Sequence, residues 1–363
     1  MAAKPNKADP ELEYSDDYES QEHPPADIVV FNELRSCADL FRLVKTDQLD
    51  VKPFFQRDLV WSDAEQTRFI DSLVKQLPIP SLCLGYDYLA RKWIVIDGLQ
   101  RLSAVIRFLD DKSDWQLSDL KDIDATLAGQ NVQTIQDPKS KLYSHYERVQ
   151  NVTLPITVLR CDFSKIDHME YLFKIFHRLN SGGVRLSNQE IRNCIYSGSL
   201  NTALVTLDGT SEWKAFKGHI IGKKDRFRSV ELILRMFAFL ERKDDYKGNL
   251  TRFLNRFMLD NRNISDDACD DYTELFVRVG MMLAQKVSPL LEGKKIGFAQ
   301  TEALLVGLGT NIDAVEAMAS RKFESRFKRF LQIPLLSTER LRNDISNREN
   351  VITRINDAIK IFS

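Results

Sequence analysis

The residues with the clearest chemical potential lie where an apolar run meets a helical pattern. Residues 93–96 are apolar, and Asp97, Gly98, Gln100 and Arg101 follow them where the helical pattern begins. Glycine lets a backbone approach a ligand, a helix N-terminus offers unpaired N–H groups, and a guanidinium matches phosphate. This order predicts a phosphate-binding turn. The structural alternative makes Asp97 a helix cap, Gly98 a turn and Arg101 a solvated side chain.

A second Gln-Arg pair lies upstream. Gln56 and Arg57 end an extended run through Pro53, just before another helix start. Taken alone, such a pair is more often a surface feature. If the two segments are adjacent, both Gln-Arg pairs can converge on one anion.

The elements that must position these residues are short and mixed. Ser62 and Glu65 have the spacing of a capping box, which predicts a helix ended by Pro78 and Pro80. Further expected elements are a hairpin of strands at 82–86 and 93–96 with the second strand central, a helix from about Gln100, and a strand at 153–160. Residues 110–150 read as polar and irregular.

The second half of the chain is helical in pattern. A helix from Asp167 ends at the adjacent glycines Gly182 and Gly183, and a second capping box, Ser187 with Glu190, opens the next helix. Further amphipathic stretches are expected near 199–207, 226–242, 249–259, 268–287, 299–318, 321–331 and 340–361. The expected fold class is α+β, with a mixed domain followed by an all-helical one.

Five ordered motifs together resemble a known family. They are Pro-Phe-Phe-Gln-Arg at 53–57, Leu-Pro-Ile-Pro at 77–80, Trp-Ile-Val-Ile-Asp-Gly-Leu-Gln-Arg-Leu at 93–102, Phe-His-Arg-Leu-Asn-Ser-Gly-Gly at 176–183 and Leu-Ser-Asn-Gln-Glu-Ile-Arg-Asn at 186–193. Over roughly residues 31–201 the chain resembles the N-terminal domain of GmrSD-type modification-dependent restriction proteins. That domain is in turn similar to the ParB and sulfiredoxin fold.

The resemblance implies binding and hydrolysis of a nucleoside triphosphate (NTP) around an Asp-Gly-Gln-Gln-Arg motif, in defence against foreign DNA. It suggests that Arg57 and Arg101 clamp phosphates, that Gln56 and Gln100 position them or a water, and that Asp97 holds a Mg²⁺-bound water or caps the helix. The catalytic candidates are Asp97, Gln100 and Arg101, and Gly98 joins them in nucleotide binding. This chain has Leu99 where the motif has its first Gln, and leucine cannot orient a water.

The Asn180, Gly182 and Gly183 turn is also among the shared motifs. Its backbone N–H groups could form an anion nest for the nucleotide. An ordinary glycine C-cap between two helices explains the same residues equally well.

The formal net charge of −1 conceals an uneven distribution. Residues 1–27 hold 8 acids and 2 lysines, residues 214–256 hold 12 Lys/Arg against 5 acids, and residues 321–363 hold 10 against 5. Aromatic residues interleave with the first basic run, at Phe216, Phe227, Tyr246 and Phe253. We expect the basic run to contact DNA through Lys223, Lys224, Arg226 and Arg228. A solvated helix face is the alternative.

Several classes of function are disfavoured. Five dispersed cysteines indicate neither a zinc site nor a disulfide framework, and no segment is apolar and long enough for a signal or a membrane span, so we expect a cytoplasmic protein. Family members are often joined to a His-Asn-His nuclease domain. None of the five histidines lies in that arrangement, so we expect the nuclease in a partner chain.

These observations define an acidic disordered arm at 1–27, a ParB-like nucleotide-binding domain at 28–163 and a helical domain with a basic surface at 164–363. The expected function is a nucleotide-dependent restriction component that recognises foreign or modified DNA and controls a nuclease, with NTP and Mg²⁺ as cofactors and no metal site of its own. One alternative is a non-hydrolysing switch or adaptor, and another is an autonomous nuclease. The oligomeric state stays open, a homo-oligomer included.

Overall fold

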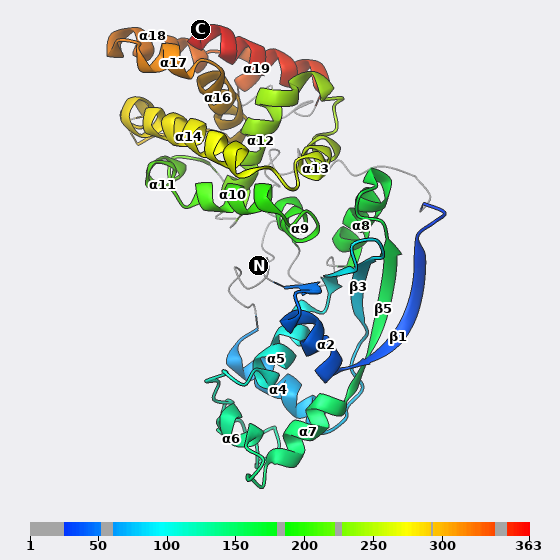
Figure 1. The fold of residues 1–363 in the computed structure, drawn as a ribbon. Helices are drawn as coiled ribbons and strands as arrows, with labels where there is room; N and C mark the ends of the chain where they lie inside the picture. The colour runs from blue at the N-terminus through cyan, green and yellow to red at the C-terminus, as the bar shows by residue number, and fades with distance from the viewer. Residues whose placement is uncertain (1–24, 52–60, 180–185, 222–226, 292, 338–346) are drawn as a thin grey trace, which may run out of the picture. The chain divides into compact units, whose positions relative to one another are not determined.

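The computed structural model describes residues 25–51, 61–179, 186–221, 227–291, 293–337 and 347–363. The chain divides into two compact units between Leu186 and Ser187. The first contains a β-sheet and the second is helical (Figure 1). This confirms the expected α+β class with a helical C-terminal region. Among the described helices, none combines the length and the apolar content that crossing a membrane requires.

The sheet-containing unit alternates strands and helices along the chain. Its elements are β1 (Val29–Ser36), α2 (Cys37–Lys45), β2 (Leu49–Asp50), α4 (Asp63–Val74), β3 (Leu82–Asp87), β4 (Lys92–Asp97), α5 (Leu99–Leu109), α6 (Val132–Gln136), α7 (Tyr143–Asn151), β5 (Thr153–Cys161) and α8 (Ile166–Leu179).

The five strands form one mixed sheet in the order β1-β5-β3-β4-β2. β1 pairs with β5 and β3 with β4 in antiparallel fashion, whereas β5 with β3 and β4 with β2 are parallel. The expected hairpin is therefore confirmed. Trp93, Ile94, Val95 and Ile96 are all buried, because both faces of β4 are covered.

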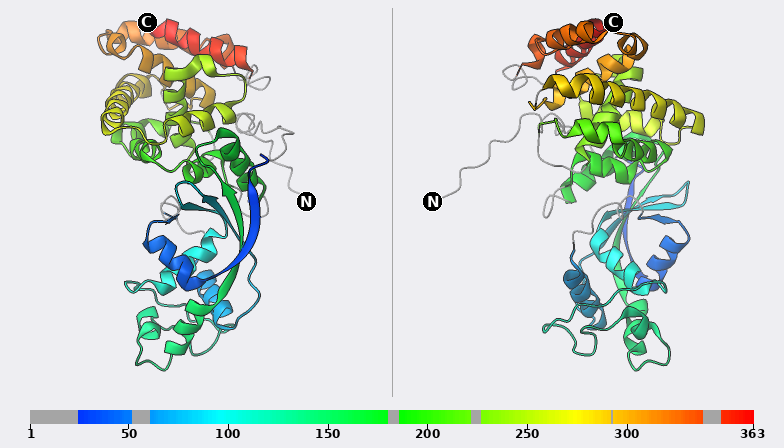
Figure 2. Two further views of the ribbon diagram at one scale, coloured as in Figure 1. Left: turned by 45° about the vertical axis from the view of Figure 1, so that its right-hand side comes forward. Right: turned by 90° about the vertical axis from the view of Figure 1, so that its left-hand side faces the viewer.

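Helices pack against the sheet. In Figure 1, α2, α4 and α5 lie on one side of the sheet, and α8 contacts β4. The capping box predicted at Ser62 and Glu65 is present and starts α4, and α5 begins one residue before Gln100. Figure 2 shows how strongly β1 and β5 curve along this unit.

Parts of this unit were not expected from the sequence. The region 110–150, interpreted as irregular, contains α6 and α7 and is anchored by the buried side chains of Trp115 and Leu127. The expected domain boundary after Phe163 also differs from the division between the compact units. Helix α8 belongs to the sheet-containing unit because it packs on β4.

The second unit is helical apart from one isolated bridge between Ile220 and Ile296 in its described residues. Its elements are α9 (Asn188–Ile195), α10 (Ser199–Asp208), α11 (Ser211–Lys217), α12 (Arg228–Arg242), a 3-10 turn (Lys243–Asp245), α13 (Leu250–Asp260), α14 (Asp266–Met282), a π-helical turn (Leu283–Val287), α15 (Ser288–Leu291), α16 (Phe298–Thr310), α17 (Ile312–Glu316), α18 (Ser320–Phe330), a second 3-10 turn (Pro334–Leu336) and α19 (Arg348–Phe362). The capping box predicted at Ser187 and Glu190 starts α9.

Most of the acidic arm, residues 1–24, lies outside the described residues. Its last residue, Asp27, is bonded to α8. The carboxylate is 2.5 Å from Lys165 Nζ and 2.8 Å from His168 Nε2. Nδ1 of His168 accepts the backbone N–H of Asp162 at 3.0 Å, so Nε2 carries the proton and donates it to Asp27. These contacts join the entry to β1 to the start of α8.

The Asp27 contacts predict a pH dependence of stability. Hydrogen bonds from Lys165 and His168 lower the pKa of Asp27 to about 2. Because the pKa of Asp27 is lower in the folded than in the unfolded chain, its carboxylate stabilises the fold at pH values above the unfolded pKa of about 4. This contribution to the free energy of unfolding is lost as the pH falls through about 2. Asp27→Asn should therefore lower the melting temperature at pH 6, and its deficit relative to wild type should shrink toward pH 2. The exposed Asp114, changed to Asn, is the control. A deficit of constant size down to pH 2 would contradict this assignment.

Candidate functional site

The β4–α5 junction turns on a glycine with no room for a side chain. Gly98 has φ 91° and ψ 15°, a left-handed conformation that other residues rarely adopt. A Cβ atom built there would lie 2.0 Å from Cδ2 of Leu82, which is fully buried. Both the backbone angle and the packing against Leu82 therefore require glycine at this corner.

The N-terminus of α5 presents unused hydrogen-bond donors. The first helical bond runs from Leu102 N–H to the Gly98 carbonyl at 3.0 Å, and no side chain caps the helix. Among the described residues, the N–H groups of Leu99, Gln100 and Arg101 have no acceptor. Three open donors at the positive end of a helix favour an anion. Asp97 does not cap this helix, so the structural alternative that the sequence offered for Asp97 is wrong.

Arg101 forms hydrogen bonds to the end of β4 and to the residues just before β3. Its Nη2 bonds to Asp97 Oδ2 at 2.9 Å and to the Ser81 carbonyl at 3.4 Å, and its Nη1 donates to the Pro80 carbonyl. Only 14% of the Arg101 side chain is exposed, against 41% for Asp97. Burial lowers the pKa of Arg101, and the Asp97 charge opposes this effect. Arg101 thus holds the start of β3, the end of β4 and the start of α5 together, rather than extending into solvent.

Gln100 connects α5 to the chain that precedes α4. Its Oε1 accepts the backbone N–H of Trp61 at 3.4 Å, and Gln66 Nε2 donates to the Trp61 carbonyl at 3.1 Å. Gln66 is buried, so Trp61 is fixed beside the α5 N-terminus. Gln56 and Arg57 lie outside the described residues, and their convergence with Gln100 and Arg101 stays a prediction.

Leu99 and Cys83 complete the surroundings of Asp97. Leu99 is only 9% exposed, so the position that distinguishes this chain from the family motif packs into the interior. Cys83 lies opposite Asp97 on the neighbouring strand. Burial, with the Asp97 charge as a smaller cause, raises the pKa of the Cys83 thiol to about 12. The thiol is protonated at neutral pH and is no nucleophile there.

A row of polar side chains leads from this junction across the sheet, and sequence reasoning missed it. Ser81 Oγ lies 3.1 Å from Thr157 Oγ1, which donates to Asn32 Oδ1 at 2.9 Å. Asn32 and Thr157 are directly paired residues of β1 and β5. No local pattern could reveal this row, because it depends on the register of strands 125 residues apart in the chain.

The other predicted binding residues are not brought to this junction by the described structure. Asn180, Gly182, Gly183, Lys223, Lys224 and Arg226 lie outside the described residues. Arg228 is described, and its guanidinium stacks 4.5 Å from the centre of the Phe298 ring with both Nη atoms buried. This position differs from the exposed DNA-binding role expected for Arg228.

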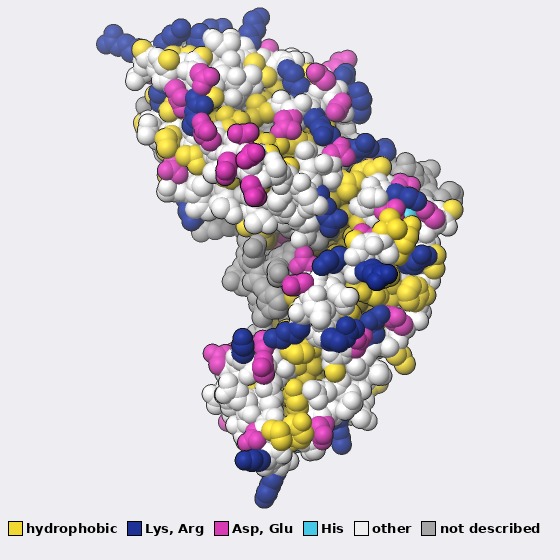
Figure 3. Space-filling view, viewed as in Figure 1, with side chains coloured by type: hydrophobic (Ala, Val, Ile, Leu, Met, Phe, Trp, Pro, Cys, Tyr) yellow, Lys and Arg dark blue, Asp and Glu magenta, His cyan; other side chains and the backbone are white. Residues whose placement is uncertain are grey.

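The basic run at 214–256 is not one continuous surface. Arg235 is 1% exposed, and the interleaved aromatic residues Phe216, Phe227, Tyr246 and Phe253 are all buried. They pack in the core and are unavailable for stacking on bases. On the face that Figure 3 shows, Lys and Arg side chains of the helical unit are mixed with Asp and Glu. The exposed cations Lys214, Lys247, Arg252 and Arg256 remain candidates for phosphate contacts.

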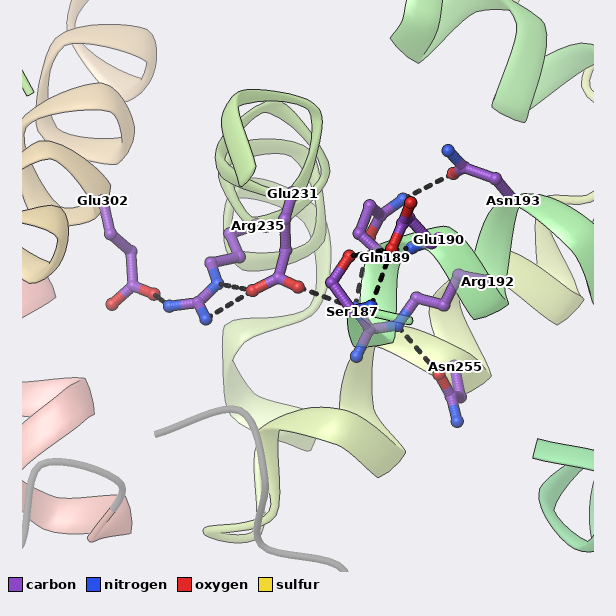
Figure 4. Close-up of polar contacts among 9 residues, drawn as sticks. All are labelled: Ser187, Gln189, Glu190, Arg192, Asn193, Glu231, Arg235, Asn255 and Glu302. Carbon is purple, nitrogen blue, oxygen red and sulfur yellow. Dashed lines mark hydrogen bonds and ion pairs between the residues drawn. The ribbon is translucent and has the colours of Figure 1, made fainter. Parts of the chain in front are cut away.

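Arg235 belongs to a buried chain of alternating charges (Figure 4). Glu231 is bonded to Arg192 at 3.0 Å and to Arg235 at 2.6 Å. Glu302 is bonded to Arg235 and to Arg354, each at 2.8 Å. Burial raises the pKa of Glu231, but the charges of Arg235 and Arg192 outweigh it and hold this pKa below its usual value. The five residues come from α9, α12, α16 and α19, so the chain joins four helices.

The described part of the chain contains no cluster of side chains that could bind a metal ion by itself. No group of three or more His, Cys, Asp or Glu side chains is placed there to hold a metal ion. All five cysteines are free thiols. The α5 N-terminus with Asp97 and Arg101 is therefore the candidate site that the geometry supports.

The Gly98 corner gives a sharp test of this geometry. Gly98→Ala should lower the free energy of unfolding by about 2 kcal/mol or more, because a left-handed alanine costs about 1–2 kcal/mol and its methyl displaces Leu82. Gly218→Ala is the matched control, since its φ is −60° and a Cβ there contacts nothing within 4 Å. Chemical denaturation of both variants measures the difference. Equal stabilities would contradict the described corner.

The comparisons with known proteins concern the part of the chain that carries this corner. Residues 38–197 match the family model described as "GmrSD restriction endonuclease, N-terminal domain". No curated protein and no solved structure matches the chain. The matched range contains all five motifs, at 53–57, 77–80, 93–102, 176–183 and 186–193. Over residues 38–197 the chain therefore matches the GmrSD N-terminal domain, which indicates a component of a restriction system in antiviral defence.

Proposed function

We propose that this protein binds the phosphates of a nucleoside triphosphate at the N-terminus of α5 and uses that binding to control DNA restriction. One observation carries the proposal. The N–H groups of Leu99, Gln100 and Arg101 are open, and they follow a left-handed glycine that leaves no side chain in the way of a phosphate. The GmrSD family match supports the setting of foreign or modified DNA.

Each residue of the corner has a distinct role in this proposal. The three N–H groups donate to phosphate oxygens, and the α5 dipole favours their negative charge. Arg101 positions the turn through the Pro80 and Ser81 carbonyls and adds positive charge at short range. Arg57 lies outside the described residues, four residues before Trp61, which is bonded to Gln100; the proposal assigns its guanidinium to the same phosphates.

Asp97 fits a metal carried by the nucleotide. Its Oδ2 is bonded to Arg101, while its Oδ1 has no hydrogen-bond partner among the described residues and the side chain is 41% exposed. Mg²⁺ with a nucleotide is held mainly by phosphates and waters and needs only one or two carboxylates. Asp97 would hold such an ion, which would neutralise phosphate charge.

The proposal extends to DNA and to a nuclease in a partner chain. Exposed cations of the basic run, among them Lys247, Arg252 and Arg256, suit phosphate contacts, and Lys223, Lys224 and Arg226 belong to the same run. The described residues hold no metal-binding cluster of the kind that a metal-dependent nuclease needs. Cleavage would then fall to another chain whose activity the nucleotide-bound state permits.

A charge substitution tests phosphate binding without removing a contact. Gln100→Glu keeps an oxygen that accepts the Trp61 N–H, and a carboxylate in the first turn stabilises a helix. Its charge repels a phosphate a few ångströms away, so we expect nucleotide affinity to fall about tenfold while the melting temperature stays equal or rises. Calorimetric titration of ATP, GTP and CTP with Mg²⁺ measures the affinity.

Gln133→Glu is the matched control, because Gln133 is exposed near the start of α6 in the same unit. It should bind nucleotide like the wild type. Arg101→Ala should also weaken binding, through loss of positive charge and of the bracing contacts. Unchanged affinity in both Gln100→Glu and Arg101→Ala would overturn the proposed phosphate site.

A non-hydrolysing switch is the second candidate function, and two side chains favour it. Leu99 is apolar and buried, and Gln100 Oε1 already accepts the Trp61 N–H. Leu99 has no polar atom that could orient an attacking water, and Gln100 Oε1 is directed to the Trp61 N–H. The protein would bind a nucleotide, change its interaction with DNA or a partner, and release the nucleotide intact.

Phosphate release separates hydrolysis from switching. With saturating NTP and Mg²⁺, with and without DNA, a switch releases less than one phosphate per chain while titration shows full occupancy. We expect this outcome because Leu99, which stands where the family motif has a glutamine, cannot orient a water. Repeated turnover that is lost in Gln100→Ala would instead identify a hydrolase.

A further inference from the structure

The edge strand β1 is unusually apolar for a solvent-facing strand. Val29, Val30, Phe31 and Leu34 are 45%, 55%, 38% and 70% exposed, and they are four of the ten large exposed hydrophobic residues in the described chain. β1 is eight residues long, and within the described part of the chain it pairs only with β5. Figure 3 shows hydrophobic side chains along the side of the unit where β1 runs in Figure 1.

The backbone of β1 is open along its outer edge. The Cys37 N–H donates to the Val152 carbonyl, and this pair continues the register of β1 with β5. Because backbone groups point alternately to the two sides of a strand, the odd-numbered residues of β1 direct their N–H and C=O groups to β5. The even-numbered residues Val30, Asn32 and Leu34 direct theirs outward. Their N–H groups have no acceptor among the described residues. A further strand can therefore bond along this edge.

Three common devices that protect an exposed edge are absent from β1. Such edges commonly carry lysine, proline or a bulge. β1 has no lysine, no proline and an unbroken register with β5. Its two charges, Glu33 and Arg35, lie on the odd-numbered face and bond to each other at 2.5 Å. The outward-directed residues are all neutral.

We propose that β1 pairs with β1 of a second copy of this chain, antiparallel and centred on Asn32. In this register Asn32 faces Asn32 of the other copy, and Val30 faces Leu34 in both halves of the pair. The two most exposed apolar residues of the strand thus cover each other twice. Phe31 faces Glu33 on the opposite face, so no like charges are opposed. The result is a continuous ten-stranded sheet across a two-fold axis.

A second copy fits this edge for reasons of symmetry. Antiparallel pairing of identical strands is self-complementary, so one patch serves both partners and the assembly closes as a dimer. The register centred on Asn32 overlaps almost the full length of β1, residues 29–35. If one β1 strand is shifted by two residues along the other, Glu33 faces Glu33 and like charges are placed together. The charge pattern of β1 therefore selects the Asn32 register over that neighbour.

Leu34→Lys tests the pairing, and Leu89→Lys is its matched control. Leu89 is 64% exposed in the same unit but lies in the turn between β3 and β4, away from the β1 edge. Light scattering coupled to size exclusion gives the mass of each full-length protein. We expect a dimer for the wild type and for Leu89→Lys and a monomer for Leu34→Lys. A monomeric wild type, or a dimer that persists in Leu34→Lys, would overturn the proposal.

A cross-link tests the register directly. Residues facing each other in a hydrogen-bonded antiparallel pair have Cα atoms about 5.5 Å apart, within disulfide range. Asn32→Cys should form a covalent dimer on mild oxidation. Ser36→Cys should not, because Ser36 of one copy faces residue 28 of the other. The unmodified chain, oxidised in parallel, reports any background from Cys269, which is the one native cysteine that is not buried. Equal cross-linking by both variants would contradict the register.

Discussion

The geometry of the candidate site depends on the corner at Gly98. The chain must leave β4, reverse onto the sheet and begin α5 in one residue, and only a left-handed glycine against Leu82 allows this. Arg101 then fixes the corner through Asp97 and the Pro80 and Ser81 carbonyls. As a result the α5 N-terminus is left uncapped and its donors stay open. The same contacts that stabilise the corner therefore leave three backbone N–H groups open at the positive end of α5.

The helical unit is organised by a different constraint. Arg192, Glu231, Arg235, Glu302 and Arg354 alternate in charge and are all buried, so each carboxylate lies between two guanidinium groups. Removing Glu231 would take away the carboxylate that two buried guanidinium groups share, which costs far more than the net gain of such a pair. Helix α9, where the family match ends, contributes Arg192 to this chain of charges. That segment of the family domain is therefore built into the core of the helical unit.

Local signals predicted much of the fold. The capping boxes at Ser62 and Ser187 start helices as expected, and the hairpin of β3 and β4 and most of the amphipathic helices are where the periodicity placed them. Capping and periodicity are encoded within a few residues, which is why they could be read directly. Helices α6 and α7 were missed because buried contacts such as those of Trp115, rather than local pattern, organise that region. The role of charged residues was less predictable, since Arg228 and Arg235 count as basic in a sequence yet both lie against the Phe298 ring, half-buried and buried respectively.

The sequence by itself determined the family match over residues 38–197, through its ordered motifs, and the position of the glycine turn between β4 and α5. Tertiary structure decided what each side chain does there. Asp97 pairs with Arg101 rather than capping the helix, and Leu99 faces the core rather than solvent. Ser81 meets Thr157 and Asn32 across the sheet. Each of these outcomes depends on strand register and on carbonyl groups that are distant in the chain. Motifs are local arrangements of residue types, whereas hydrogen-bond partners and burial are set by long-range packing, and only the folded chain brings those groups together.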